Sequence, residues 1–330
     1  MPPLRIALCY DLKDDYLAAG FSPAQVMEFD EEDTVAALAA ALTGLGHRVE
    51  RVGRGVELAR KLAGGARWDL VFNLAEGVAG RSREAQVPAV CELFEQPYTF
   101  SDPLTCAVTL DKPMAKRLIR DCGLPTAPFA VVERPEEAAA VELAPPLFVK
   151  PIAEGSSKGV TERSRVDASS ELPEACRALL TAFGQPVLVE RYLPGREVTV
   201  GIVGNGPAAA VVGVMEVVFR PGSDGDYTAL NKGEYEERVT YRLLDGEPLA
   251  LRARELALAV YRALGCRDAG RVDLRCDTLG EPQFLEINPL PGLHPVRSDL
   301  PIMCRLAGMT YPELLEKILD AARRRCGLCC

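Results

Sequence analysis

The chain has 330 residues, 48% hydrophobic and 26% charged, so it can bury sizeable cores in two or three domains. Its formal net charge is −9 and it has no basic stripe, which argues against a nucleic-acid partner. No apolar run reaches the roughly 18 residues of a membrane helix, and the first ten residues lack a signal-peptide core, so we expect a cytoplasmic protein without a membrane partner.

The first predicted elements alternate between strand and helix. Leu4–Cys9 and Asp69–Leu74 are short apolar runs typical of buried strands. Between them, Thr34–Leu45 has the helical spacing of apolar residues, and Gly46 ends it. This order predicts a small N-terminal parallel-sheet domain over residues 1–108.

A helix from Asp111 to Cys122, ended by Gly123, opens the next region. Strands are predicted at Phe129–Glu133 and Leu147–Pro151, on either side of a helical segment rich in alanine and glutamate. We expect a small central α+β domain over residues 109–187.

The remaining residues, 188–330, are predicted to form a C-terminal domain with an antiparallel sheet. Asn205-Gly206 predicts a tight turn between two of its strands. The elements expected besides a hairpin near residue 280 are three strands and two helices: Val187–Tyr192, Glu197–Val203, Ala209–Phe219, Pro248–Leu264 and Tyr311–Arg325.

The eleven cysteines do not suggest a disulfide framework. The count is odd, and most cysteines, such as Cys9 and Cys91, stand singly inside apolar stretches, where a reduced thiol behaves as a small hydrophobe. Cys326 and Cys329 have a CxxC spacing but no second ligand pair nearby, so a frayed terminus is preferred to a zinc site.

A segment rich in small residues follows the strand that carries Lys150. The segment runs Glu154, Gly155, Ser156, Ser157, and its small side chains would let backbone N–H groups approach a phosphate beside the lysine charge. A polar hairpin turn is the alternative, and the segment alone does not decide between them. The Walker sequence GxxxxGK[ST] is absent, so the P-loop mode of binding ATP is excluded.

The strongest pattern is a hairpin whose two strands carry polar residues at alternate positions. Arg271 and Asp273 share one face of the first strand, and Glu286 and Asn288 share one face of the second. A turn symmetric about residues 279–280 would place Asp273 opposite Glu286 and Arg271 opposite Asn288. The apolar residues assigned to the other face are Val272, Leu274, Leu285 and Ile287.

Two carboxylates facing each other across a ladder repel unless a cation lies between them or one is protonated. Oxygen ligands from Asp273, Glu286 and Asn288 suit Mg²⁺ or Mn²⁺ better than zinc. The alternative is a solvated hairpin face with a surface salt bridge.

Together these residues resemble the ATP-grasp superfamily, and within it the D-alanine–D-alanine ligases, over about residues 92–315. Further similar segments are Glu92–Thr99, Leu110–Lys112, Gly123–Thr126 and Val187–Glu197. The resemblance implies an ATP-grasp fold: an N-terminal pre-ATP-grasp domain, a small central α+β domain and a C-terminal antiparallel-sheet domain. It also implies ATP, two Mg²⁺ ions and a homodimer.

The resemblance assigns roles residue by residue. Phosphate and nucleotide contacts are expected from Lys112, Lys150, Glu154, Ser156, Ser157, Glu190, Arg191, Leu193 and Glu197. The metal ligands are Asp273, Glu286 and Asn288, and Arg271 stabilises the reacting oxyanion. Ser156 and Lys232, the latter in a segment that closes over the site, take part in catalysis, and Gly292 and Ser298 help to bind the second amino acid.

The N-terminal region departs from this pattern. Tyr10–Asp15 and Phe29–Asp33 stand where the ligases have a glycine-rich first loop, and Gly80–Gln86 replaces their acidic segment. Arg81 and Arg83 could therefore bind a larger or more acidic carboxylate, or form an exposed basic loop. Likewise, His294 and Arg297 could line the substrate pocket, and a structural role for His294 is the alternative.

The resemblance implies an ATP-dependent ligase that joins a carboxylic acid to an amine through an acyl phosphate. D-Alanyl-D-alanine is the default product. The alternatives are a ligase of another pathway, with a different amino acid or a carrier-bound amine, and a non-catalytic nucleotide-binding protein. The substrates are expected to be small amino acids or carboxylates.

Overall fold

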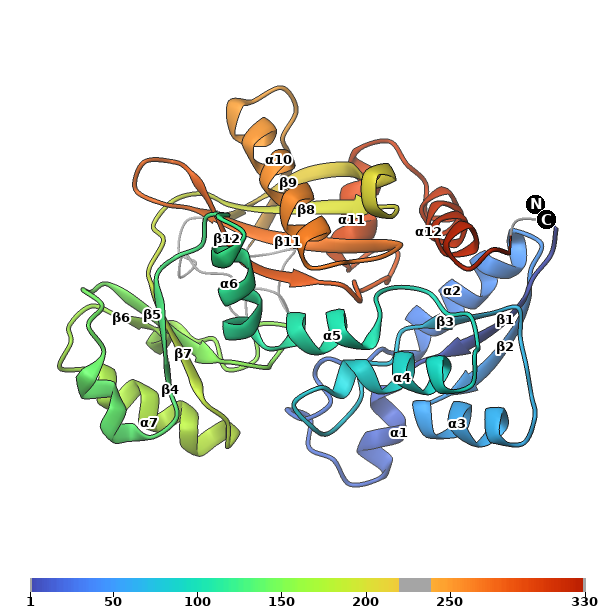
Figure 1. The fold of residues 1–330 in the computed structure, drawn as a ribbon, viewed down its shortest axis with the longest axis horizontal. Coiled ribbons are helices and arrows are strands. Elements are labelled where there is room, and N and C mark those ends of the chain that lie inside the picture. The colour runs from blue at the N-terminus through green and yellow to red at the C-terminus, as the bar shows by residue number, and fades with distance from the viewer. Residues whose placement is uncertain (1, 220–238, 329–330) are drawn as a thin grey trace.

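The computed structural model describes residues 2–219 and 239–328, which form three sheets with helices packed around them (Figure 1). The N-terminal sheet is parallel, with strand order β2-β1-β3. Its strands are β1 (Arg5–Cys9), β2 (Arg48–Gly53) and β3 (Leu70–Asn73). The helices of this region are α1 (Lys13–Ala18), α2 (Glu32–Gly44), α3 (Gly55–Ala63) and α4 (Gln86–Leu93).

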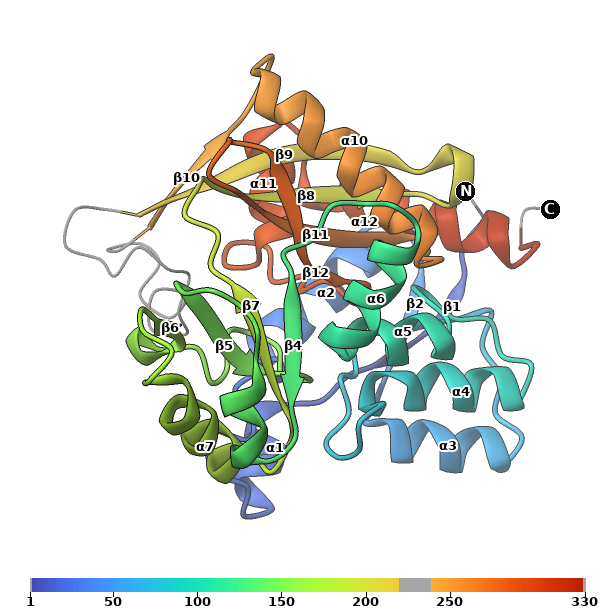
Figure 2. The same ribbon diagram turned by 60° about the vertical axis from the view of Figure 1, so that its left-hand side comes forward.

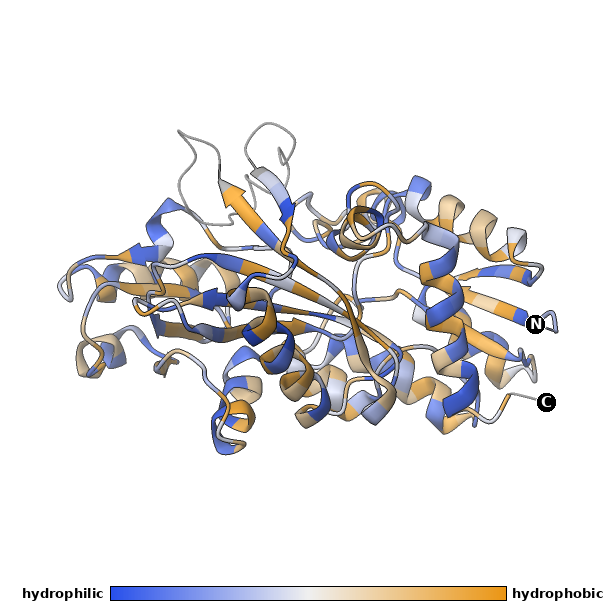
Figure 3. Ribbon diagram, turned by 90° about the horizontal axis from the view of Figure 1, so that it is seen from above, coloured by the Kyte–Doolittle hydropathy of each residue, from blue (hydrophilic) through white to orange (hydrophobic). Residues whose placement is uncertain are grey.

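Both faces of the N-terminal sheet are covered, as a parallel sheet requires. Ile6 and Leu8 of β1 pack into a core with α2 and the C-terminal helix α12 (Tyr311–Arg325). Ala7 and Cys9 point to the other side and pack against α3 and α4. Figure 3 shows hydrophobic residues gathered on the strands and on one side of the covering helices. The predicted strands at β1 and β3, the helix at α2 and the parallel sheet are all present, whereas β2 and α3, which lie between α2 and β3 in the chain, were not predicted.

The central sheet is antiparallel, with strand order β4-β7-β5-β6. Its strands are β4 (Phe129–Val132), β5 (Leu147–Pro151), β6 (Arg165–Val166) and β7 (Val187–Arg191), and helix α7 (Leu172–Phe183) packs against it. Because β7 pairs with β4 and β5, the sheet continues to Arg191, and the boundary predicted after residue 187 falls inside this strand.

The prediction of an α-helix between β4 and β5 was wrong. Only a short 3-10 helix, Pro135–Ala140, forms there, and the covering helix of the sheet is α7 instead. Pro145 and Pro146 follow closely, and proline disfavours helical backbone in the residue before it, so a longer helix has no room.

The C-terminal sheet is antiparallel, with strand order β10-β9-β8-β11-β12. Its strands are β8 (Glu197–Val203), β9 (Ala210–Phe219), β10 (Val239–Leu243), β11 (Ala269–Cys276) and β12 (Pro282–Asn288). Helix α10 (Pro248–Ala263) covers one face and α11 (Asp299–Leu306) approaches the other (Figure 2). A Cβ atom on Gly201 would lie 2.9 Å from the sulfur of Met303, so glycine allows α11 to pack this closely.

The connection between β8 and β9 is longer than the tight turn predicted at Asn205-Gly206. It contains a 3-10 helix, Gly206–Ala208, and the strands pair from Val203 and Ala210 outward. Pro207 explains the difference, because it has no N–H to donate to a ladder directly after the turn.

Helices α5 (Pro103–Leu110) and α6 (Lys112–Asp121) join the N-terminal domain to the other two. The carboxylate of Asp111 caps α6 by accepting a hydrogen bond from the N–H of Met114 at 3.0 Å. Ala115 and Ile119 pack into the core of the C-terminal sheet, so the first residue of α6, Lys112, is fixed at the junction of the domains.

The described cysteines are free, and all but Cys122 and Cys326 are buried. Cys329 and Cys330 lie outside the described residues. Across residues 2–219 and 239–328, no helix combines the length and apolar character that crossing a bilayer requires.

Candidate active site

The polar hairpin has the register that the sequence predicted. Asp273 of β11 pairs with Glu286 of β12, and Arg271 pairs with Asn288. The register shifts between Asp273 and Leu274, so a bulge follows this pair. Four polar side chains therefore lie on neighbouring positions of one sheet face.

The bulge corrects one assignment. Leu285 was expected on the core face with Val272, but Leu274 pairs with Phe284, and Phe284 is the residue buried in the core. Leu285 instead lines a pocket together with Glu286. The extra residue of the bulge turns two successive side chains of β12 toward the same cavity.

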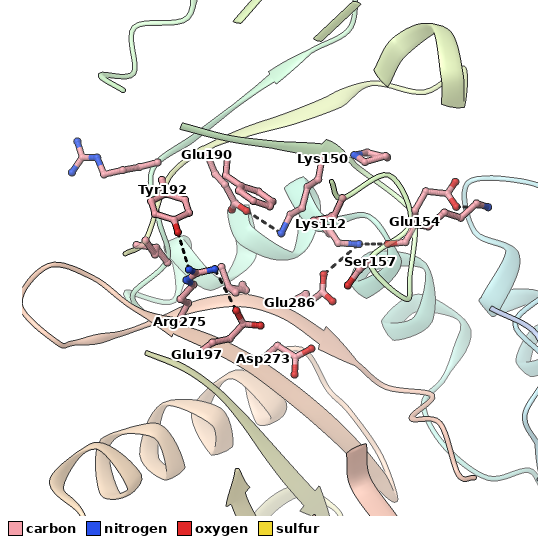
Figure 4. A pocket seen from close by; sticks show the side chains of 17 residues that line it. Lys112, Lys150, Glu154, Ser157, Glu190, Tyr192, Glu197, Asp273, Arg275 and Glu286 are labelled. Atoms are coloured by element: carbon pink, nitrogen blue, oxygen red, sulfur yellow. Dashed lines mark hydrogen bonds and ion pairs between the residues drawn. The ribbon is translucent and has the colours of Figure 1, made fainter. Parts of the chain in front are cut away.

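That cavity, the inter-sheet pocket, lies between the central and C-terminal sheets (Figure 4). Of the residues predicted to contact phosphate or nucleotide, all but Ser156 line it. The lining residues on which the argument depends are Lys112, Phe148, Lys150, Glu154, Ser157, Glu190, Arg191, Tyr192, Leu193, Glu197, Asp273, Arg275, Leu285 and Glu286.

Positive charge is concentrated at one end of the inter-sheet pocket. Lys112 Nζ lies 3.5 Å from a carboxylate oxygen of Glu286 and donates to the carbonyl oxygen of Glu154 at 2.5 Å. Ser156 and Ser157 in the adjoining loop have φ angles of 46° and 57°. Left-handed backbone costs a non-glycine residue about 1 kcal/mol or more, and such conformations concentrate at ligand-binding loops.

Glu190 is buried between two lysines. Its carboxylate oxygens lie 2.9 Å from Lys150 Nζ and 2.9 Å from Lys116 Nζ. Burial alone would raise the pKa of Glu190, but the two lysine charges outweigh it and lower the pKa to about 2. The carboxylate is thus ionised, and it holds Lys150 at the wall of the pocket. The nucleotide contact predicted for Glu190 stays a prediction.

Aromatic and apolar side chains line the opposite end of the inter-sheet pocket. The rings of Phe148 and Tyr192 are stacked with centroids 6.4 Å apart. Arg275 Nη2 donates to the hydroxyl of Tyr192 at 3.0 Å, and Nη1 donates to Glu197 at 3.3 Å (Figure 4). A flat aromatic base would fit this end, with the Glu197 carboxylate beside it as a hydrogen-bond acceptor.

Sequence reasoning missed several side chains in or beside the inter-sheet pocket. Arg275 stands two positions after Asp273, so the same alternation that linked Asp273 to Arg271 could have found it. Lys116 stands four positions after Lys112 on the buried face of α6, an unusual place for a lysine. Phe148 and Tyr192 carry no such signal, because aromatic residues in strands are usually core residues.

A second cavity, the acidic pocket, lies beside the first and reaches into the N-terminal domain. Ser156, Arg271, Asn288, Gly292, His294, Arg297 and Ser298, all predicted site residues, line it. A Cβ atom on Gly292 would lie 2.9 Å from Ser298 Oγ, which in turn accepts a hydrogen bond from the N–H of His294 at 2.9 Å. Glycine is therefore required for this close approach.

Arg271 and the His294 loop are held by acidic residues. Arg271 donates to both oxygens of Asp273, at 3.1 and 3.0 Å, and also pairs with Asp299. Asp33 of α2 lies 3.2 Å from His294 Nε2 and 2.8 Å from Arg297 Nη2. The N-terminal domain thus contacts the His294 loop of the acidic pocket directly.

The two pockets share Lys112, Glu154 and Glu286. These three side chains form the border between a cavity with an apolar, base-sized end and a cavity open to the N-terminal domain. A group bound at the lysine end of the first pocket would face a ligand in the second.

Arg81 and Arg83 do not reach either pocket lining. Arg81 pairs with Asp111 at 2.6 Å, and most of its side chain is exposed. Arg83 is buried, pairs with Glu28 at 2.8 Å and donates to the carbonyl oxygen of Ala153 at 2.8 Å. Neither is placed to bind a substrate carboxylate, and Lys232 lies outside the described residues.

Asp273, Glu286 and Asn288 fit a hard divalent cation. Asn288 Nδ2 donates a hydrogen bond to a carboxylate oxygen of Asp273 at 3.2 Å, and Glu286 faces Asp273 across the ladder. Thr199 and Arg271 donate hydrogen bonds to Asp273, which fixes its carboxylate toward the pocket. Two carboxylates and an amide oxygen are the donor set that Mg²⁺ prefers.

Comparison with known proteins agrees with this geometry. The family model for the D-ala D-ala ligase C-terminus matches residues 118–320. The D-alanine–D-alanine ligase of Sinorhizobium fredii is 34% identical over 290 residues, covering 87% of this chain and 91% of that protein. The uncharacterized protein y4sG of the same organism is 37% identical over 260 residues, covering 78% and 75%.

The fold matches as well. The crystal structure of the D-alanine–D-alanine ligase from Bacillus anthracis complexed with ATP superposes with a TM-score of 0.74 at 20% identity, covering 98% of this chain and 99% of that one. The predicted ATP-grasp fold is confirmed. On this sequence similarity, supported by the fold, the chain belongs to the D-alanine–D-alanine ligase family.

Proposed function

We propose that the protein is an ADP-forming ligase that joins a carboxylic acid to an amine through an acyl phosphate, with Mg²⁺ as cofactor. The observation that carries the proposal is the shared border of the two pockets at Lys112, Glu154 and Glu286. This border would place the last phosphate of a nucleotide against a carboxylate held in the acidic pocket.

The inter-sheet pocket would hold ATP. Its base would stack near Phe148 and Tyr192, its ribose would lie at Glu197, and its phosphates would lie at Lys112 and Lys150. Asp273, Glu286 and Asn288 would hold two Mg²⁺ ions, which when bound would offset phosphate charge during phosphoryl transfer. The lysines supply the remaining positive charge, and the loop at Ser156 and Ser157 would exclude water.

Arg271 would stabilise the oxyanion that forms when the amine attacks the acyl phosphate. Its guanidinium is oriented by Asp273 and Asp299, so it would not need to reorganise during the reaction. The second amino acid would lie beside Gly292 and Ser298, with the amine facing the acyl phosphate. The homodimer and the cytoplasmic location expected from the sequence stay predictions.

Phosphate release from ATP tests the proposal. The protein would be assayed with Mg²⁺ and a panel of D- and L-amino acids, singly and in pairs. The expected result is release that depends on an amino acid and on the divalent ion. Nucleotide binding without release by any amino acid would support a non-catalytic nucleotide-binding protein instead.

A further inference from the structure

The lining of the acidic pocket has more acidic than basic groups available to a ligand. This excess of negative charge limits which carboxylate substrate the proposed function can use. Basic side chains line it, and each one is already paired. Lys13 lies 2.9 Å from Glu31, Lys112 lies 3.5 Å from Glu286, and Arg297 lies 2.8 Å from Asp33. Arg271 is paired with Asp273 and Asp299.

Among the residues that the structure describes, three acidic side chains on the same lining have no such partner. They are Asp30, just before α2; Glu76, just after β3; and Glu84, in the 3-10 helix Arg83–Ala85. Within residues 2–219 and 239–328, no hydrogen bond or ion pair joins these three carboxyl groups to another side chain. Glu28 lines the same pocket but is not unpaired. Its carboxylate forms an ion pair with Arg83 and accepts a hydrogen bond from the N–H of Gly155.

This unpaired charge is unfavourable in the absence of a ligand. Burial raises the pKa of Glu84 to about 7 and that of Asp30 to about 7, and neighbouring acids add to both shifts. Burial likewise raises the pKa of Glu76, to which Glu28, Glu84 and Asp30 add. A cation entering the pocket would stabilise the charged forms.

A single metal ion does not account for the arrangement. In the part of the chain that the structure describes, no three histidine, cysteine or acidic side chains lie close enough together to hold one. Carboxylates spread along a wall fit an organic cation with separated charges.

We propose that the carboxylate substrate is a basic amino acid, with a second cationic group besides its α-amino group; this rests on the proposed function. The carboxylate of such a substrate would face Lys112 at the border of the two pockets. The α-ammonium group of a neutral amino acid would balance the charge of one of the three unpaired carboxylates and leave two without a counter-charge. A second cationic group on the substrate would balance another. An acidic substrate, one of the two alternatives raised by Arg81 and Arg83, is disfavoured because those arginines are paired with Asp111 and Glu28 outside the pocket lining.

The test compares initial rates of phosphate release with three groups of amino acids, in both enantiomers. Lysine, ornithine and 2,3-diaminopropionate are the basic probes, alanine is the neutral probe, and glutamate is the acidic one. We expect kcat/KM for the best basic probe to exceed that for alanine by roughly 10–100-fold, the range of one charge-assisted contact. Equal or faster turnover of alanine would overturn this inference and leave the ligase function standing, whereas no release with any probe would overturn the function itself.

Two variants separate a specificity role from a structural one. Glu76→Gln and Glu84→Gln keep the side-chain shape, and each should lower kcat/KM for the basic probe at least fivefold more than kcat/KM for alanine, because alanine brings only one ammonium group to the wall. Glu174→Gln, on the exposed face of α7, is the control and should change neither value. Equal losses on basic and neutral probes would assign the two carboxylates to the fold and overturn the inference.

A binding measurement does not depend on turnover. Calorimetry with lysine and a non-hydrolysable ATP analogue at pH 7 should show proton release on binding, since the ligand would ionise raised carboxyl groups. The heat should therefore vary with the ionisation enthalpy of the buffer, and less so in Glu84→Gln. Lysine binding with no proton release in either protein would contradict the proposal.

Discussion

Glu28 and Arg83 form a buried ion pair, with 2.8 Å between Oε2 and Nη2, and both residues also hold the loop at residues 153–157. Glu28 Oε1 accepts a hydrogen bond from the N–H of Gly155 at 2.5 Å, and Arg83 Nη1 donates to the carbonyl oxygen of Ala153 at 2.8 Å. The side chains are only 4% and 9% exposed, so water does not compete for these bonds. The N-terminal domain therefore positions the loop that would cover the nucleotide phosphates.

Loss of this pair should weaken ATP binding more than the chemical step. Glu28→Gln leaves Arg83 without its charge partner and loosens the loop, so we expect the KM for ATP to rise roughly 10–100-fold with a smaller change in kcat. Steady-state kinetics at saturating amino acid measures both values. Glu57→Gln, which breaks a partly exposed ion pair with Arg54 in the same domain, is the control. An unchanged KM in Glu28→Gln would contradict the positioning role.

The hairpin carboxylates should be essential for turnover but not for folding. Glu286→Ala removes a metal ligand, and we expect at least a 100-fold loss of ATP turnover with a thermal unfolding temperature close to that of the parent protein. Glu281→Gln changes an exposed carboxylate at the end of the same hairpin and should retain full activity. Near-normal ligase activity in Glu286→Ala would refute the assigned role.

Glu190 should stabilise the fold through its two lysines. Glu190→Gln leaves Lys116 and Lys150 buried without their counter-charge, so we expect a loss of roughly 3–5 kcal/mol in the free energy of unfolding. Urea denaturation measures this loss. The double variant Glu190→Gln, Lys116→Met should recover part of it, because one buried charge is removed; no recovery would mean that Lys116 is not the source of the loss.

The same carboxylate predicts a pH dependence of stability. Its pKa is lowered from 4.5 when unfolded to about 2 when folded, so its contribution is complete above pH 4.5 and is lost as the pH falls toward 2. Unfolding free energies measured from pH 6 down to pH 3 should therefore fall less steeply in Glu190→Gln than in the parent. Parallel curves would show that Glu190 is not ionised against the lysines.

Gly292 should tolerate no side chain. In Gly292→Ala the new Cβ would lie 2.9 Å from Ser298 Oγ and 3.4 Å from its Cβ, so Ser298 must move. We expect KM for the second amino acid to rise roughly tenfold while nucleotide affinity stays unchanged, since the inter-sheet pocket is not touched. Ala307→Ser, directly after α11, is the control and should change neither value. Another glycine such as Gly280 would be a poor control, because a side chain there would be strained by its backbone φ of 81°.

The sequence predicts those parts of the site that depend on contacts between residues close together in the chain. The Asp273–Glu286 register was predictable because strand alternation and a nearby turn set it locally. The bulge that directs Leu285 to the pocket was not, because Phe284 and Leu285 are both apolar and only packing against the core selects between them. Tertiary packing decides such cases.

The arginines at 81 and 83 show the same limit. Their carboxylate partners, Asp111 and Glu28, are far away along the chain, so the loop alone could not reveal that both arginines are already paired. Helix α7 was missed for a different reason. The alanine-rich segment before Leu147 was predicted to be the helix of this domain, although Pro145 and Pro146 there oppose a helix.

The transfer of oxygen from substrate to phosphate tests the central claim most directly. The amino acid that supports the fastest release would be labelled with oxygen-18 in its carboxylate, and the inorganic phosphate would be analysed by mass spectrometry. An acyl phosphate requires that one carboxylate oxygen leave with the phosphate, so each turnover should yield phosphate with one labelled oxygen. Amino-acid-dependent release of unlabelled phosphate would show that water, and not the carboxylate, accepts the phosphoryl group.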